Sequence, residues 1–201
     1  MRFRALALAA LLPCLAVSAD WDRAKIQGST LAPVAIEVFA SFDCIHCKIL
    51  HEGMMLRIVR DLVLTGKACV VSREFPLFGP GHAYAREAAN LATAAARVGK
   101  YQAVADALFK NQQAWEVSGK VWETVAAALT PAEQIKVKAL ANDPGVLAEV
   151  QKDYDQGAAM GINQTPTLMV IRQKDGRRYP FPGIQITYEM FRDFITKDLA
   201  K

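Results

Sequence analysis

Two cysteines separated by two residues, Cys44 and Cys47, are the side chains of this 201-residue chain best suited to chemistry. A thiolate attacks disulfides and binds soft metals, so the chemistry depends on which sulfur is ionised near neutral pH. His46 lies between them and supplies a hydrogen-bond donor and, when protonated, a positive charge beside Cys44. The pair is therefore a candidate redox couple.

The residues around the pair predict that it lies where a strand gives way to a helix. The run Val34 to Ala40 is β-branched and aromatic, which is typical of a buried strand. From Cys47 towards Gly66 an apolar face recurs at helical spacing. Its members are Ile49, Leu50, Leu56, Ile58, Val59 and Leu62. Cys44 would then lie at the first turn, where free N–H groups and the helix dipole favour an anion. Cys47, one turn further, would be shielded and would resolve a mixed disulfide at Cys44.

Structural and metal-binding uses of these cysteines are less well supported. A disulfide across two residues at a helix start closes little chain and is strained. Cys44, Cys47 and His51 lie close along one predicted helix, and Cys69 or His82 would complete a metal site, but the sequence has no second Cys-x-x-Cys and no His-x-x-x-His. We expect no metal, and no organic cofactor, because a disulfide is itself a two-electron carrier.

Cys69 and His82 have local contexts of their own. Cys69 lies in a second predicted strand, Ala68 to Glu74, where a cysteine is most often a small buried hydrophobe. His82 lies in a glycine-flanked loop before a helix and is either a helix cap or a residue of the active face. His51 alone is better explained as a surface or packing histidine.

The first nineteen residues have the pattern of a secretory signal peptide. Arg2 and Arg4 form a positive start, residues 5–16 are apolar apart from one proline, and small residues at 17–19 precede the expected cleavage. The apolar run is too short to span a bilayer comfortably. We therefore expect a periplasmic or otherwise exported protein.

The mature chain, residues 20–201, is expected to form one domain. Loss of residues 1–19 removes two arginines and no acids, which lowers the formal net charge from +4 to +2. So weak a positive charge does not indicate nucleic-acid binding. Three remaining cysteines are too few for a domain held together by disulfides, so the close pair favours redox chemistry.

The order of predicted elements is strand, helix, strand, a block of helices, a hairpin and a closing helix. Between Ala83 and Met160 the pattern is helical and predicts four or five short helices. Two predicted helices begin with an N-cap before a proline, at Thr130 and at Asp143. Glu133, three residues after Thr130, completes a capping box. The hairpin strands are Thr167 to Arg172 and Arg177 to Phe181. The last helix starts at Thr187, with Met190, Phe191, Phe194, Ile195 and Leu199 on one face.

Thr165 and Pro166 lead directly into a predicted strand and are a second candidate for a special site. A proline at the start of a strand is tolerated only at an edge, a bulge or a cis bond. The alternative is an ordinary turn proline.

Together these residues resemble the DsbA-like branch of the thioredoxin superfamily. The similar segments are the strand leading into Ser41 to Cys47, Arg73 to Leu77, the alanine-rich helices, and Thr165 to Thr167. The resemblance implies a thioredoxin-like α/β fold with a helical insertion, about residues 82–160, between an N-terminal βαβ part and a C-terminal β-hairpin plus helix. It also implies that Pro166 is cis and faces the cysteines, and that Thr165 offers backbone groups to an extended substrate segment.

The chain departs from that family at two places. Ile45 stands where the best-known oxidases have proline, so the redox potential is not transferred. The family often has a buried acid six residues before the first cysteine, and here that residue is Val38. Glu37 is one residue away and is expected on the opposite face of the strand.

We therefore predict an exported thiol:disulfide oxidoreductase that forms disulfides in cysteine-containing secreted proteins. Cys44 would form the mixed disulfide, Cys47 would resolve it, and His46 would tune Cys44. A redox partner, membrane-bound or soluble, would regenerate the disulfide, and the protein is expected to be a monomer.

Two alternatives remain open. The first is a disulfide reductase or isomerase, of which the isomerase ranks lower because only Asp20 to Pro33 precedes the first strand. The second is a periplasmic copper or zinc carrier that uses the same thiolates.

Overall fold

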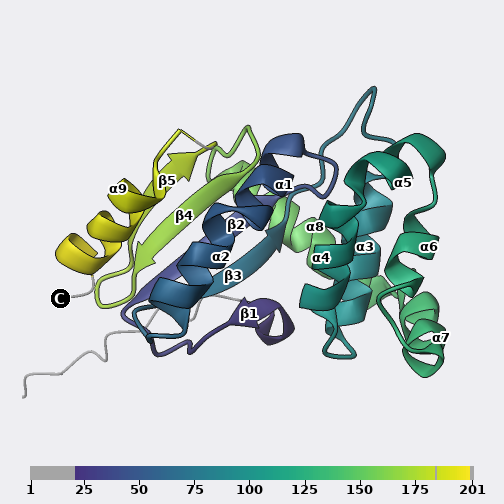
Figure 1. Ribbon diagram of the computed structural model, residues 1–201, viewed down its shortest axis with the longest axis horizontal. Helices are drawn as coiled ribbons and strands as arrows, with labels where there is room; N and C mark the ends of the chain where they lie inside the picture. The colour runs from purple at the N-terminus through teal and green to yellow at the C-terminus, as the bar shows by residue number, and fades with distance from the viewer. Residues whose placement is uncertain (1–20, 184, 200–201) are drawn as a thin grey trace, which may run out of the picture.

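A five-stranded mixed sheet forms the centre of the computed structural model, which describes residues 21–183 and 185–199 (Figure 1). The strands are β1 (Ile26–Gln27), β2 (Val34–Ala40), β3 (Ala68–Glu74), β4 (Thr167–Arg172) and β5 (Arg177–Pro182). They lie in the order β1-β3-β2-β4-β5, with β2 and β3 parallel and the other neighbours antiparallel. The predicted α/β fold is confirmed. The predicted signal peptide, residues 1–19, lies outside the described residues.

The central strand β2 is buried on both faces, as its apolar sequence predicts. Alternate side chains point to opposite faces of the sheet. Val34, Ile36 and Val38 join one apolar cluster, and Ala35 and Phe39 join another on the far side. Each face therefore needs its own cover of helices.

The first face is covered by the helical segments between β2 and β3 and by those that follow β5. They are α1 (Ile45–Glu52), α2 (Met54–Ile58), a π-helical turn (Val59–Val63), α9 (Tyr188–Asp193) and a second π-helical turn (Phe194–Leu199). The expectation of one unbroken helix up to Gly66 is wrong, because the backbone of Gly53 leaves the helical region. Ile49 and Leu56, expected on the buried face, are exposed to solvent, and so is Met190 of the last helix.

The helical insertion lies beside the sheet, and α8 runs back across its second face (Figure 1). Its helices are α3 (Ala85–Ala96), α4 (Tyr101–Lys110), α5 (Gln112–Ser118), α6 (Val121–Ala126), α7 (Pro131–Leu140) and α8 (Pro144–Ala159). The fully described stretch between β3 and β4 thus has six helices rather than four or five. Asn111 alone separates α4 from α5, without the glycine or proline that marks the other breaks. The capping box of Thr130 with Glu133 and the Asp143 cap are confirmed.

Close approach of α8 to the sheet depends on Gly157. A Cβ atom at this position would lie 2.7 Å from the Phe75 ring and 3.0 Å from the Phe39 ring. Phe75 in turn stacks on Tyr154 with ring centroids 4.7 Å apart. The small residue therefore lets the helix seal the second face. Among the described residues, no helix has the length and apolarity that crossing a membrane requires.

Candidate active site

Cys44 is the N-cap residue of α1, at the end of the central strand, as the sequence predicts. Its side chain is partly exposed. A hydrogen bond from the Cys47 thiol is the main reason that the pKa of Cys44 falls from 9.0 to about 5. Hydrogen bonds from the backbone N–H groups of Cys47 and His46 act in the same direction, against the opposing effect of partial burial. Cys44 is therefore a thiolate at neutral pH.

Cys47 has the opposite environment. Its side chain is 1% exposed and packs in the apolar cluster that contains Phe42 and Phe109. Burial, followed by the neighbouring Cys44 sulfur, raises the pKa of Cys47 well above its usual value. One sulfur of the pair is thus ionised and accessible, and the other is protonated and shielded.

His46 is exposed on the first turn of α1. Its backbone N–H favours the Cys44 thiolate. Within the described part of the chain, no hydrogen bond joins its imidazole ring to Cys44. The residue acts on the sulfur through the main chain here, and tuning by the charge of its ring stays a prediction.

The Thr165–Pro166 peptide bond is cis, as the family resemblance implies. This loop lies against the cysteines, since Cys44 Sγ and the Thr165 carbonyl oxygen are 3.4 Å apart although 121 residues separate them in sequence. The fold therefore brings the two separate sequence signals to one place. Pro166 is tied to the end of β5 by the Gly183 N–H, which donates to its carbonyl oxygen over 2.7 Å.

The loop between β2 and α1 is fixed by side chains from distant segments. The Asp43 carboxylate accepts hydrogen bonds from the Ser41 hydroxyl and from His82 Nδ1, the latter over 2.6 Å. The Gln112 amide on α5 donates to the Phe42 carbonyl oxygen over 2.6 Å. The structure thus places His82 on the active face rather than as a helix cap. Sequence reasoning missed Asp43, for which the only signal was its position next to Cys44.

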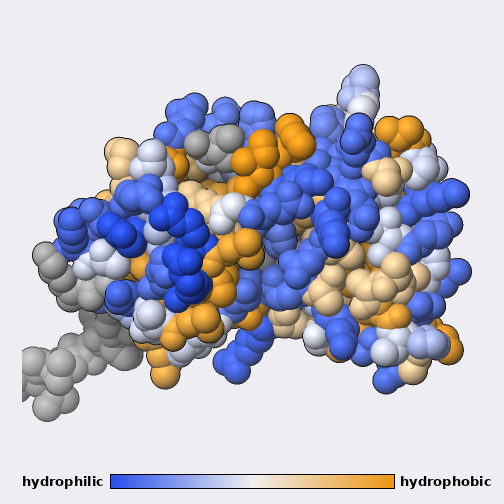
Figure 2. Space-filling view, in the orientation of Figure 1, coloured by the Kyte–Doolittle hydropathy of each residue, from blue (hydrophilic) through white to orange (hydrophobic). Residues whose placement is uncertain are grey.

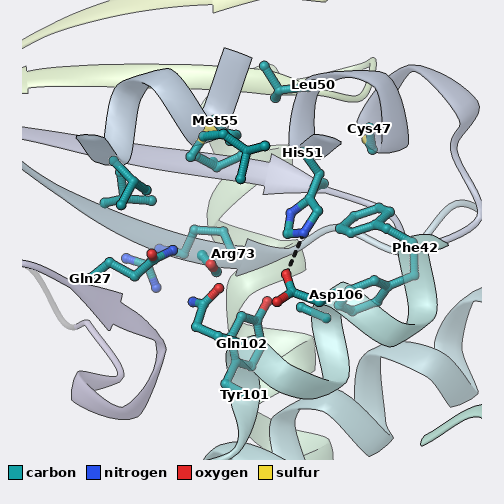
Figure 3. A pocket seen from close by; sticks show the side chains of 18 of the residues that line it. Gln27, Phe42, Cys47, Leu50, His51, Met55, Arg73, Tyr101, Gln102 and Asp106 are labelled. Carbon is teal, nitrogen blue, oxygen red and sulfur yellow. Dashed lines mark hydrogen bonds and ion pairs between the residues drawn. The ribbon is translucent and has the colours of Figure 1, made fainter. Parts of the chain in front are cut away.

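A cavity of about 250 Å³ lies behind Cys47, between the sheet, α1, α2 and α4 (Figure 3). Leu50 and Met55 line its apolar side, and Tyr101 and Glu74 line its polar end. At its rim His51 Nε2 and the Asp106 carboxylate are 2.7 Å apart. The His51 ring also packs on Phe109 with centroids 4.6 Å apart, so it is a packing histidine.

Glu37 lies on the opposite face of the sheet from this cavity, as expected. Its carboxylate accepts hydrogen bonds from Arg73 over 2.7 Å and from the Trp21 indole over 2.8 Å. Arg73 also pairs with Asp153 on α8 over 2.6 Å, and Lys25 pairs with the same carboxylate over 2.5 Å. Each of these buried charges has an opposite partner, which is the condition for burying it. Glu37 therefore belongs to a structural network rather than to the cysteine site.

Glu74 faces the cavity and is fully buried. Burial raises its pKa from 4.5 to about 7, against the opposing effect of Lys25 and of a hydrogen bond from the Tyr101 hydroxyl. That hydrogen bond is 2.8 Å long. A carboxyl group with a raised pKa therefore lies at the polar end of the cavity.

Cys69 lies on the second face of the sheet, in the cluster with Ala35 and Phe39. Burial raises its pKa to about 11, so it is the inert hydrophobe that its strand position predicts. Within residues 21–183 and 185–199, no three His, Cys, Asp or Glu side chains converge so as to hold a metal ion.

A family model described as thioredoxin matches residues 22–197. Among solved structures, Wolbachia pipientis alpha-DsbA1 superposes with a TM-score of 0.73 at 23% identity, covering 88% of this chain and 90% of that one. Pseudomonas aeruginosa DsbA2 gives a TM-score of 0.65 at 21% identity, with 88% and 96% covered. At these identities the likeness shows the shared fold.

Curated relatives are longer proteins. The Na(+)/H(+) antiporter NhaA 1 of Mycolicibacterium vanbaalenii is 32% identical over 158 residues, which are 76% of this chain and 24% of that protein. This chain thus spans about a quarter of the length of the curated relatives that it matches.

The Cys44 pKa should depend on Cys47. We expect Cys47→Ala to raise the pKa of Cys44 from about 5 to roughly 7, because the variant removes its main hydrogen-bond donor. Thiolate absorbance at 240 nm, followed against pH on the reduced protein, measures this. Cys69→Ala is the control and should leave the titration unchanged. An unchanged pKa in Cys47→Ala would show that the helix terminus alone stabilises the thiolate.

Glu74 should make stability depend on pH. Its folded pKa lies above the unfolded value, so the folded protein holds an extra proton between about pH 4.5 and 7, and stability falls as pH rises through this range. In Glu74→Gln we expect the free energy of unfolding to fall less with rising pH, by up to about 3 kcal/mol over this range. Urea denaturation at pH 5 and pH 8 tests it, with the exposed Glu52→Gln as control. Parallel pH dependence in wild type and Glu74→Gln would contradict the assignment.

Proposed function

Since the chain belongs to the thioredoxin family and has the fold of the DsbA proteins, we propose that it is a thiol:disulfide oxidoreductase that introduces disulfides into exported proteins. The observation that carries this proposal is the unequal state of the two sulfurs. Cys44 is partly exposed with a pKa of about 5, and Cys47 is buried with a raised pKa.

The low pKa favours the oxidase direction. A stabilised Cys44 thiolate stabilises the dithiol form relative to the disulfide form. This stabilisation grows as the pH rises from about 5, the pKa of Cys44, towards 9.0, the ordinary pKa of a cysteine. A stable dithiol makes the corresponding disulfide a strong oxidant. The protein would therefore donate its disulfide rather than reduce others.

Each site residue has a role in this scheme. A substrate thiolate attacks Cys44 in the disulfide form and releases Cys47, which takes up a proton. A second substrate thiolate then attacks the mixed disulfide and releases Cys44 as a stable thiolate. Thr165 and cis-Pro166 bind the extended substrate segment beside Cys44, and His46 tunes the sulfur.

The surface around Cys44 suits unfolded substrates. Figure 2 shows apolar residues gathered at the surface over α1 and α2, where Ile45, Ile49 and Leu56 are each more than half exposed. Such an apolar patch on a solvent-exposed surface is typical of an interaction site. Cysteine-containing exported proteins, and a redox partner that restores the disulfide, would dock here. The antiporter activity named for the longer relatives is theirs, and it is not proposed for this chain.

Activity should depend on Cys44 and Cys47 but not on Cys69. We expect Cys44→Ser to reduce oxidative refolding of a reduced substrate protein to the background rate, because no sulfur remains for the mixed disulfide. With glutathione disulfide present as the oxidant, Cys47→Ser should hold a mixed disulfide at Cys44 that mass spectrometry detects, and Cys69→Ser is the matched control with full activity. Full activity in Cys44→Ser would refute the proposal.

The direction of the reaction can be measured separately. Equilibration of the Cys44–Cys47 pair with glutathione buffers should give a potential more oxidising than about −180 mV, because the thiolate stabilises the dithiol. A value near about −270 mV, as in thioredoxin, would instead support a reductase.

A further inference from the structure

The two sulfurs of the active pair open onto different spaces. Cys47 lines the cavity behind α1, whereas Cys44 lines a separate polar pocket of about 540 Å³. The pocket is built by α1, α5 and the loop that follows β3. Its lining residues are Asp43, Cys44, Ile45, Lys48, Leu77, His82, Gln112, Gln113 and Glu116.

The geometry of disulfide exchange makes this pocket the entry side. A thiolate attacks a disulfide sulfur in line with the bond that breaks, so the nucleophile approaches the attacked sulfur from the side opposite the leaving sulfur. With Cys47 buried as the leaving sulfur, the incoming thiol must approach Cys44 from its exposed side. Cys44, the sulfur that is attacked, lines the polar pocket. Cys47, the sulfur that leaves, does not line it.

A histidine and aspartate pair lies in this pocket. His82 Nδ1 is 2.6 Å from Asp43 Oδ2, and the side chain of Asp43 is 2% exposed whereas that of His82 is 31% exposed. An ionised carboxylate only accepts hydrogen bonds, so the ring nitrogen that faces Asp43, Nδ1, carries a proton, and Nε2 is the nitrogen left to exchange a proton with a bound group. No hydrogen bond to Nε2 occurs among the described residues. A histidine nitrogen without a hydrogen bond in the described structure thus belongs to the same pocket as the reactive sulfur.

An incoming thiol needs such a base. An ordinary cysteine thiol has a pKa near 8.5, so only about 3% of it is ionised at pH 7. We propose that the Asp43–His82 pair is the general base that removes the proton from the incoming substrate thiol. The inference rests on the proposed function, and it assigns to His82 and Asp43 a step that the two cysteines do not perform.

The step balances as follows. His82 Nε2 takes the proton of the substrate S–H, and the resulting thiolate forms an S–S bond with Cys44 while the Cys44–Cys47 bond breaks. The electron pair of that bond leaves with Cys47, which is then protonated. Substrate sulfur is oxidised and Cys47 is reduced, so no further oxidant is required.

The surrounding charges favour a transient imidazolium. Glu116 on α5 faces the pocket, with one carboxylate oxygen buried and without a hydrogen-bond partner in the described structure. Its charge interacts with Asp43, His82 and Cys44. Lys48, the cation on the α1 side, donates to the Lys110 carbonyl oxygen over 3.2 Å. A protonated His82 would therefore share the pocket with two carboxylates, Asp43 and Glu116.

The variant that separates catalysis from structure is His82→Asn. The asparagine amide occupies the place of Nδ1 and keeps a donor to Asp43, but it has no second ring nitrogen. His51→Gln is the matched control, because His51 forms the same kind of pair with Asp106 over 2.7 Å at a cavity that Cys44 does not line.

The experiment compares two thiols at pH 7 with the disulfide form of the protein. A cysteine peptide is mostly protonated, and an aryl thiol of low pKa is already ionised. Acid quenching and mass spectrometry give the rate of opening of the Cys44–Cys47 disulfide. We expect His82→Asn to slow disulfide opening by the cysteine peptide by about three- to thirtyfold, where the upper limit follows from the ionised fraction of the peptide thiol at pH 7. The rate of opening by the aryl thiol should stay within about twofold of the wild-type rate. The peptide defect should vanish above about pH 9.

Every other result overturns the inference. An equal loss with both thiols would mean that His82 acts by shape or charge, and no loss with the peptide would mean that it does not act as a base. A loss of the same kind in His51→Gln would also overturn it. If the wild-type disulfide opens with neither thiol, the proposed function itself has failed, which is a different outcome.

Discussion

The hydrogen bond between the two active-site sulfurs is the interaction on which the site depends. It holds one proton between two cysteines at the start of α1, and burial decides that Cys47 keeps it. The backbone N–H groups of Cys47 and His46 in the first turn then stabilise the charge left on Cys44. A Cys-x-x-Cys at any other place in a helix would lack the free N–H groups that make this division possible.

The fold supplies the rest by joining segments that are far apart in sequence. The cis-proline loop before β4 approaches Cys44 from one segment, and Asp43 is held by His82 from another. Gln112 from the helical insertion fixes the backbone just before the pair. The insertion therefore does more than cover the sheet, because it supplies walls for both spaces around the cysteines.

Local pattern was enough to predict the strands β2 to β5 and the two helices capped by Thr130 and Asp143, because each has its signal within a few residues. The Gly53 break, the exposed Ile49 and the Asn111 boundary were not predictable in the same way, since tertiary packing decides them. At the site, Cys44, Cys47 and Pro166 carry motifs that sequence reasoning can find. The partnership of Asp43 with His82 spans 39 residues and has no local signature.

Separation of the two spaces gives the pair a direction. Cys47 lines the cavity behind α1, and burial together with the neighbouring Cys44 sulfur raises the pKa of its thiol, so this thiol stays protonated. Cys44 meets an accessible pocket with charged groups of both signs. A substrate can then reach only one sulfur of the oxidised pair, and the other can only leave. Attack at the wrong sulfur would require a partner to enter the apolar core, which burial of Cys47 at 1% exposure prevents.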